Sequence, residues 1–184
     1  YIMTAKLSDK SGIKLTKQDE VSFRSSQKAE KPLVINGDAS DWKLEELCAV
    51  PFERYHTSWG KRPESPKDLD AKMYTRWDKD YLYFLVIVND DNSVVRENSV
   101  NIWQDDNIML GIYPWGWKVG TPLNSGYYRE HLGPCLDGQA RAFRVGNPPG
   151  GQTDTNGVKI AVKRTDSGYV YEWAYPMKSL VPLE

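Results

Sequence analysis

The stretch AKMYTRWDKDYLYFLVIVNDD, residues 71–91, predicts the centre of the fold. Residues 71–77 and 81–88 are rich in strand-forming side chains, and the Asp-Lys-Asp segment between them has the length and polarity of a hairpin turn. One face of the second arm carries Leu82, Phe84, Val86 and Val88, and the other carries Tyr81, Tyr83, Leu85 and Ile87. Because both faces are apolar, this arm is expected to be a central strand that is covered on both sides.

Further short strand patterns occur on both sides of this hairpin. They are found at 31–36, 47–55, 101–113, 140–145, 158–164 and 168–176. Turn residues separate them, and the segments 58–68 and 115–139 are predicted to be loops because they are rich in Gly and Pro. Many short strands without helical periodicity favour an all-β fold, an antiparallel, jelly-roll-like β-sandwich.

The length of 184 residues suits one domain with a substantial core. Residues 1–31 are polar and rich in Lys and Ser, so they are expected to form an N-terminal edge strand or a linker. The sandwich is therefore expected to occupy residues 32–184. Because the chain begins at Tyr1 and shows no signal-peptide pattern, it is interpreted as a mature or excised piece.

Charge and hydropathy exclude two classes of partner. The 24 Lys and Arg residues nearly balance the 25 Asp and Glu residues, and no block of one sign predicts binding to nucleic acid. The longest apolar run, at 81–88, is far shorter than a membrane helix, so no membrane insertion is expected. Cys48 and Cys135 could form one disulfide or remain two unpaired, partly buried cysteines, and both alternatives stay open.

No catalytic constellation is recognisable. His56 and His131 fall in predicted loops and have no spacing typical of a metal pair or of a nucleophile and its base. Adjacent carboxylates occur at 90–91 and 105–106, but neighbouring strand residues point to opposite faces and could not flank one glycosidic bond. The sequence therefore predicts a protein without catalytic residues.

Aromatic residues are the positive signal for function, with seven Trp and eleven Tyr. Trp42, Trp77 and Trp173 are expected in the core, whereas Trp59, Trp103, Trp115 and Trp117 have the Gly, Pro, Gln and Asp neighbours of a sheet rim. A sugar site needs an aromatic platform beside hydrogen-bonding groups. Trp103 together with Gln104 and Arg144 meets this requirement. Trp103 is also expected to share one strand face with Asp105 and Met109. In the alternative, Trp103 covers the end of the sandwich and touches no ligand.

Five segments together resemble the family 9 carbohydrate-binding modules. They are PLVINGDASDW (32–42), WDKDYLYFLVIVNDD (77–91), IWQDDNIMLGI (102–112), FRV (143–145) and GYVYEWAYPMKSL (168–180). Their order and spacing match the family over residues 32–180. The resemblance implies a non-catalytic, extracellular β-sandwich that binds an oligo- or polysaccharide and accompanies the catalytic domain of a secreted glycan-active enzyme.

The resemblance also implies a site in which two tryptophans hold a sugar. By position, Trp103 resembles one of them, and Arg144 resembles an arginine that donates to sugar hydroxyls. Met109 stands where family members place a sugar-binding glutamate, and a thioether cannot replace that acceptor.

The family's second tryptophan lies in closing strands that this sequence lacks. Either the chain is truncated, or the sandwich is completed by residues 1–31 or by Trp115 and Trp117.

Structural calcium is a further implication of the family. Calcium binds six to eight oxygen atoms, and Asp-rich turns can supply them. Asp90 and Asp91 in NDDNS and Asp38 in NGDASD are the predicted ligands, although such turns often bind no ion.

Three functional classes follow from these patterns. The first is the glycan-binding module. The second is a haem-binding electron-transfer domain of the same superfamily, with Met109 and His131 or a lysine as axial ligands. The third is a structural module that packs on a neighbouring domain through its tryptophans.

Overall fold

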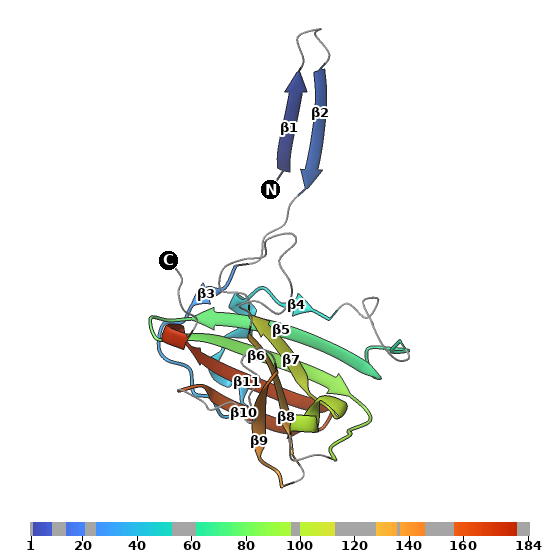
Figure 1. The fold of residues 1–184 in the computed structure, drawn as a ribbon, viewed down its shortest axis with the longest axis vertical. Coiled ribbons are helices and arrows are strands. Elements are labelled where there is room, and N and C mark those ends of the chain that lie inside the picture. The colour runs from blue at the N-terminus through green and yellow to red at the C-terminus, as the bar shows by residue number, and fades with distance from the viewer. Residues whose placement is uncertain are drawn as a thin grey trace.

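Six strands form the main sheet of the computed structural model, which describes residues 2–8, 14–20, 25–52, 62–96, 100–112, 128–135, 137–145 and 157–179 (Figure 1). The strands are β3 (Gln27–Lys28), β4 (Val50–Pro51), β5 (Leu69–Trp77), β6 (Tyr81–Asp90), β10 (Lys159–Thr165) and β11 (Gly168–Pro176). Their order is β10-β11-β6-β5-β3, and β4 also pairs with β5. Every pair is antiparallel except β3 with β5.

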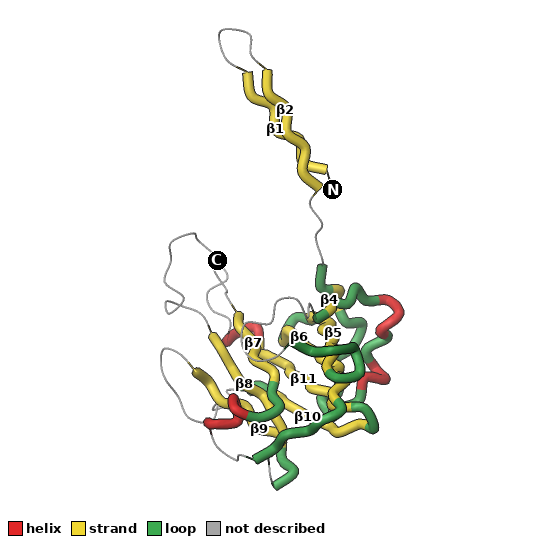
Figure 2. Tube along the Cα trace, turned by 90° about the vertical axis from the view of Figure 1, so that its right-hand side faces the viewer, coloured by secondary structure: helices red, strands yellow, loops and turns green. Residues whose placement is uncertain are grey.

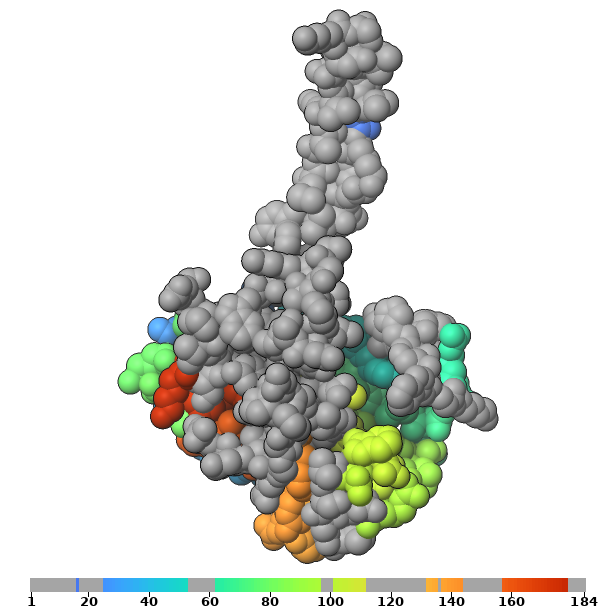
Figure 3. All heavy atoms as spheres, viewed as in Figure 1, coloured from blue at the N-terminus to red at the C-terminus, as the bar shows by residue number. Residues whose placement is uncertain are grey.

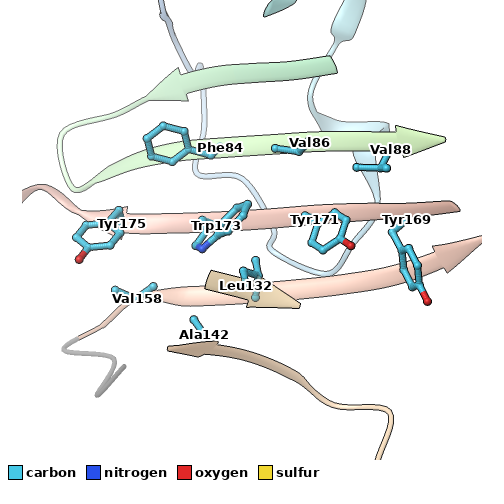
Figure 4. Close-up of a cluster of buried hydrophobic side chains, with 10 residues drawn as sticks. All are labelled: Phe84, Val86, Val88, Leu132, Ala142, Val158, Tyr169, Tyr171, Trp173 and Tyr175. Atoms are coloured by element: carbon cyan, nitrogen blue, oxygen red, sulfur yellow. The ribbon is translucent and has the colours of Figure 1, made fainter. Parts of the chain in front are cut away.

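A smaller sheet packs on one face of the main sheet (Figure 2). It consists of β7 (Ile108–Ile112), β8 (Tyr128–Pro134) and β9 (Ala140–Val145), all antiparallel. The core between the sheets contains Phe84, Val86, Val88, Leu132, Ala142, Val158, Tyr169, Tyr171, Trp173 and Tyr175 (Figure 4). The predicted all-β sandwich is confirmed.

The central hairpin forms as the sequence predicts. In the register of β5 and β6, Trp77 faces Leu82 across the turn. One carboxylate oxygen of Asp78 accepts the N–H groups of Asp80 at 2.7 Å and Tyr81 at 2.8 Å, and the other accepts the Tyr83 hydroxyl at 2.6 Å. Burial alone would raise the pKa of Asp78, but these hydrogen bonds outweigh it and hold the pKa below its usual value.

The second face of the main sheet is covered by the segment 29–47, which is mostly loop. Its apolar residues pack on the odd-numbered face of β6 and on β11 in a cluster of Ala29, Leu33, Trp42, Tyr83, Leu85, Val170 and Ala174. Two short 3-10 helices interrupt the segment, η1 (Ala39–Asp41) and η2 (Leu44–Glu46). β6 is therefore covered on both faces, as its two apolar faces predict.

Glu172 of β11 fastens this covering segment to the sheet. Its side chain is fully buried, and one oxygen accepts the indole N–H of Trp42 at 2.7 Å. The other oxygen accepts the backbone N–H groups of Asn36 at 2.8 Å and Gly37 at 2.5 Å. Because a buried carboxylate is stable only when it is hydrogen-bonded, these three donors fix the 36–42 turn on the sheet.

The remaining described elements are small. β1 (Ile2–Ser8) and β2 (Lys14–Glu20) pair with each other in a two-stranded sheet of their own. Two more 3-10 helices are η4 (Val100–Gln104) and η5 (Met177–Ser179). In the part of the chain that the structure describes, no helix has the length and hydrophobicity to cross a membrane.

Several sequence-based predictions of strand extent are wrong. Residues 100–104 form η4, so the predicted strand 101–113 begins only at Ile108. β8 lies inside the predicted loop 115–139 and contains His131, which was expected in a loop. In the predicted strand 47–55, only Val50 and Pro51 are strand among the described residues, and residues 31–36 form none.

The predicted core residues are confirmed in two of three cases. Trp42 and Trp173 are fully buried, whereas Trp77 is 37% exposed. The Trp77 ring lies at the sheet edge, where its N–H donates to the Ser26 carbonyl at 3.2 Å and the Lys28 ammonium lies over it. The two cysteines are unpaired: Cys48 is exposed and Cys135 is buried.

Candidate functional site

Trp103 presents its ring on the surface at the end of η4, with 51% of the residue exposed. The preceding residue, Ile102, is fully buried and packs with Phe143 of β9 and with Cys135, which follows β8. A 3-10 helix turns by about 120° per residue, so the burial of Ile102 directs the next side chain away from this cluster. The segment 100–112 lies on the visible surface in Figure 3. Trp103 is therefore a surface residue and not part of the core.

Arg96 and Asp105 hold the backbone next to this ring. The Asp105 side chain is 1% exposed, and its two oxygens accept the Arg96 backbone N–H at 2.6 Å and the Arg96 Nε–H at 3.1 Å. Arg96 Nη2 also donates to the carbonyl of Gln104 at 3.0 Å, and Gln104 itself is exposed. The sequence pattern did not reveal Arg96, because contacts between two loops have no characteristic spacing.

Asp106 makes a second link between the same two segments. Its carboxylate accepts the N–H of Val94 at 2.8 Å, and its own N–H donates to the Val94 carbonyl at 2.9 Å. Burial raises the pKa of Asp106, and the nearby negative charges of Asp90 and Asp105 raise it further. Asp105 and Asp106 thus support the loop, and the expected strand face shared by Trp103 and Asp105 does not exist.

The structure does not test the other predicted sugar-binding residues, although Phe143, next to Arg144, packs with Ile102, next to Trp103. Arg144 lies in β9 opposite Glu130 of β8, and only its backbone is described. Trp115 and Trp117 lie outside the described residues, as does Trp59.

Met109 is a second exposed apolar residue near the start of β7. It is 55% exposed, and its register partner across the ladder is His131 of β8. For His131 the structure describes only the backbone. The pairing places the two residues of the haem hypothesis opposite each other, but no ligand geometry follows from it.

The three predicted calcium ligands lie in two separate turns. Asp90 accepts the N–H of Asn92 at 2.9 Å, and Asp91 is exposed in the same turn. Asp38 instead accepts the N–H of Ser40 at 3.0 Å and lies 3.8 Å from the Lys163 ammonium. Among the residues that the structure describes, no three His, Cys, Asp or Glu side chains are grouped to hold a metal ion. Calcium stays a prediction from the family.

Part of this chain is similar to a family of carbohydrate-binding domains and to segments of much longer enzymes. Residues 39–113 match the family described as "Carbohydrate family 9 binding domain-like". Endo-1,4-beta-xylanase A of Thermoanaerobacterium saccharolyticum is 33% identical over 113 residues, which cover 61% of this chain and 9% of the xylanase. Exoglucanase XynX of Acetivibrio thermocellus is 34% identical over 114 residues, which cover 61% of this chain and 9% of the exoglucanase. The match thus spans about a tenth of each relative's length.

Solved structures share the fold. A carbohydrate binding module family 9 from Caldicellulosiruptor kristjanssonii in complex with glucose superposes with a TM-score of 0.55 and 14% identity, covering 82% of this chain and 68% of that chain. A complex of such a module from the same organism with cellotriose gives the same TM-score, with 66% of that chain covered.

The family match includes η1, the central hairpin, η4 and β7, and therefore contains Trp103 and the loop that supports it. The resemblance deduced from the five sequence segments is confirmed. Residues 39–113 of this chain match the carbohydrate family 9 binding domain-like family.

Proposed function

We propose that this chain is a non-catalytic carbohydrate-binding module in which Trp103 is the stacking platform. The half-exposed ring of Trp103 carries the proposal. Sugar rings have apolar faces of C–H groups that pack on aromatic rings, and their hydroxyl edges need polar partners. The family that residues 39–113 match is a family of binding domains, in agreement with this role.

The loop around Trp103 is suited to binding because it is held before a ligand arrives. Asp105 accepts two hydrogen bonds from Arg96, and Asp106 exchanges two with Val94. A preorganised platform loses less conformational entropy on binding than a flexible one. We infer that these contacts raise affinity without touching the sugar.

The proposed ligand is an oligo- or polysaccharide of glucose or xylose units. The matching relatives are named as a xylanase and an exoglucanase, and the structural relatives hold glucose and cellotriose. Gln104 and Arg144 are the proposed donors to the sugar edge, and Met109 offers an apolar surface where an acceptor would otherwise stand.

We further propose that the module belongs to a larger, secreted glycan-degrading enzyme. The named relatives are about ten times longer than the matched region, which leaves room in them for other domains. In such an enzyme the module would keep the catalytic domain close to its insoluble substrate and so raise the local substrate concentration.

The test compares Trp103→Ala with Trp77→Ala, which removes another partly exposed indole at the sheet edge. Each variant is titrated with cello- and xylo-oligosaccharides by calorimetry. Loss of a stacking hot spot costs about 2 kcal/mol, so Trp103→Ala should bind about 30-fold more weakly, while Trp77→Ala binds like the wild type. Equal affinities in the three proteins would remove Trp103 from the site, and a wild type that binds no oligosaccharide would refute the function.

A further inference from the structure

A cavity lies between the two sheets at the end of β6, and Trp103 is not among the residues that line it. Its volume is about 280 Å³. Its apolar walls are formed by Phe52, Leu69, Ala71, Val88 and Ile108, and its polar groups come from Asp90, Asp105, Asp106, Asn107, Tyr169 and Tyr171. Phe52 is 37% exposed, so one wall of the cavity is an accessible aromatic ring.

Tyr171 is a largely buried residue that lines this cavity. The residue is 2% exposed and lines the cavity, yet its hydroxyl makes no hydrogen bond with any residue in the described part of the chain. Figure 4 shows its ring running toward the Tyr169 end of β11. The Tyr169 hydroxyl, by contrast, bonds with Ser93 at 2.5 Å and accepts from Arg164 at 2.9 Å. Because the Tyr171 hydroxyl has no hydrogen bond with the described residues, it is free to bond with a molecule in the cavity.

The other polar groups of the cavity are mostly acceptors. Asp90 and Asp106 contribute carboxylates, and Asn107 contributes an amide. No Lys, Arg or His is among the described residues that line the cavity. The complementary ligand therefore carries several hydrogen-bond donors, as a molecule with many hydroxyl groups does.

The apolar walls of the cavity favour an organic ligand over a metal ion. Calcium requires six to eight oxygens around a small volume, whereas this cavity has apolar walls on several sides. The described carboxylates also form no group suited to a metal. The volume lies just below the range of about 300–1,000 Å³ that is typical of small-molecule sites, which fits one small ring.

We propose that this cavity is a second subsite that receives one neutral sugar residue, with the Tyr171 hydroxyl, Asp90 and Asp106 bonded to its hydroxyls and Phe52 against its apolar face. The inference rests on the proposed glycan-binding function and extends it. The module would then hold a glycan at two places, on the Trp103 ring and in this cavity.

The decisive variant is Tyr171→Phe, with Tyr175→Phe as the matched control on the same face of β11. Tyr175 does not line the cavity. Glucose, xylose and cellotriose are titrated into the full chain by calorimetry, and each variant is also melted. Tyr171→Phe should bind about three- to tenfold more weakly, as expected for one lost hydrogen bond, with an unchanged or higher melting temperature because no native bond is removed. Tyr175→Phe should keep the wild-type affinity.

Three results would overturn the assignment. The first is equal sugar affinity in the wild type and Tyr171→Phe while Trp103→Ala binds weakly, which leaves the proposed function intact. The second is an equal loss of sugar affinity in Tyr175→Phe, which would show that any change in β11 weakens binding. The third is a melting response to calcium alone that Tyr171→Phe diminishes while sugar affinity stays the same, which makes the cavity a cation site. A wild type that binds no sugar removes both proposals.

Discussion

Replacement of Glu172 by Gln tests how the covering segment 29–47 is held on the main sheet. Glutamine keeps the shape of the side chain but turns one of two accepting oxygens into an amide donor. If the remaining oxygen faces the N–H groups of Asn36 and Gly37, the new amide faces the indole N–H of Trp42. The change therefore loses one charge-assisted bond and leaves a buried donor unpaired.

The expected loss follows from these two effects. A hydrogen bond to a charged group contributes about 1.5–3 kcal/mol, and an unpaired buried donor costs about 1–3 kcal/mol. Because the segment relaxes in part, we expect the free energy of unfolding of Glu172→Gln to fall by about 2–4 kcal/mol. In a chain of this size the melting temperature should fall by about 5–15 °C. Urea unfolding followed by tryptophan fluorescence measures the first quantity, and calorimetry the second.

A double-mutant cycle with Trp42→Phe isolates the cost of placing the new amide donor opposite the indole N–H of Trp42. Phenylalanine has no N–H, so the new amide no longer meets a donor, and Glu172→Gln should cost at least about 1 kcal/mol less in that background. An identical cost in both backgrounds would show that the Trp42 bond is not what Glu172 contributes. If the Glu172→Gln single variant lies within about 0.5 kcal/mol of the wild type, Glu172 does not fasten the covering segment to the sheet.

Three other perturbations have defined outcomes. The pKa of Asp106 is raised in the folded protein, so its contribution to stability is complete below the ordinary value of 3.8 and is lost as the pH rises through the raised value. Asp106→Asn should therefore be more stable than the wild type at pH 7 but not at pH 3, whereas a pH-independent difference in thermal melts would contradict this. Gly168→Ala should lose about 2 kcal/mol or more in urea unfolding, because φ is +148° and a Cβ would lie 2.2 Å from the Val88 carbonyl oxygen; wild-type stability would refute the predicted clash. If calcium is bound, EDTA should lower the melting temperature by several degrees and added calcium should restore it; an unchanged melt with no metal in elemental analysis would end the calcium proposal.

The central strands could be predicted because the pattern of apolar residues in each strand indicates which of its faces are buried. β6 has apolar side chains on both faces, and β11 alternates tyrosine and tryptophan with smaller residues, so local pattern and final environment agree. The covering segment was harder to predict. Residues 31–36 resemble a strand, but they lie over the face of a sheet, and Val34 is 62% exposed.

The candidate site could be predicted in part, since Trp103 was correctly placed at the surface. Its local structure was not, because η4 depends on the burial of Ile102 against Cys135 and Phe143, which are distant in sequence. β8 was missed for a similar reason. Its sequence, YREHLGP, contains charges, Gly and Pro, and it becomes a strand through pairing with β7 on one side and β9 on the other.

The covering segment determines at which residue a fusion of this module to another enzyme should begin. A fusion that starts where the family match starts, at residue 39, and runs on to the end of the chain would leave out Ala29 and Leu33, which cover Tyr83 and Leu85. It would also delete Asn36 and Gly37, and the buried Glu172 carboxylate would keep one of its three donors. Such a graft would carry Trp103 on a sheet whose second face is only partly covered, by Trp42, Leu44 and Leu47. A fusion that begins at residue 25 or earlier retains the whole cover.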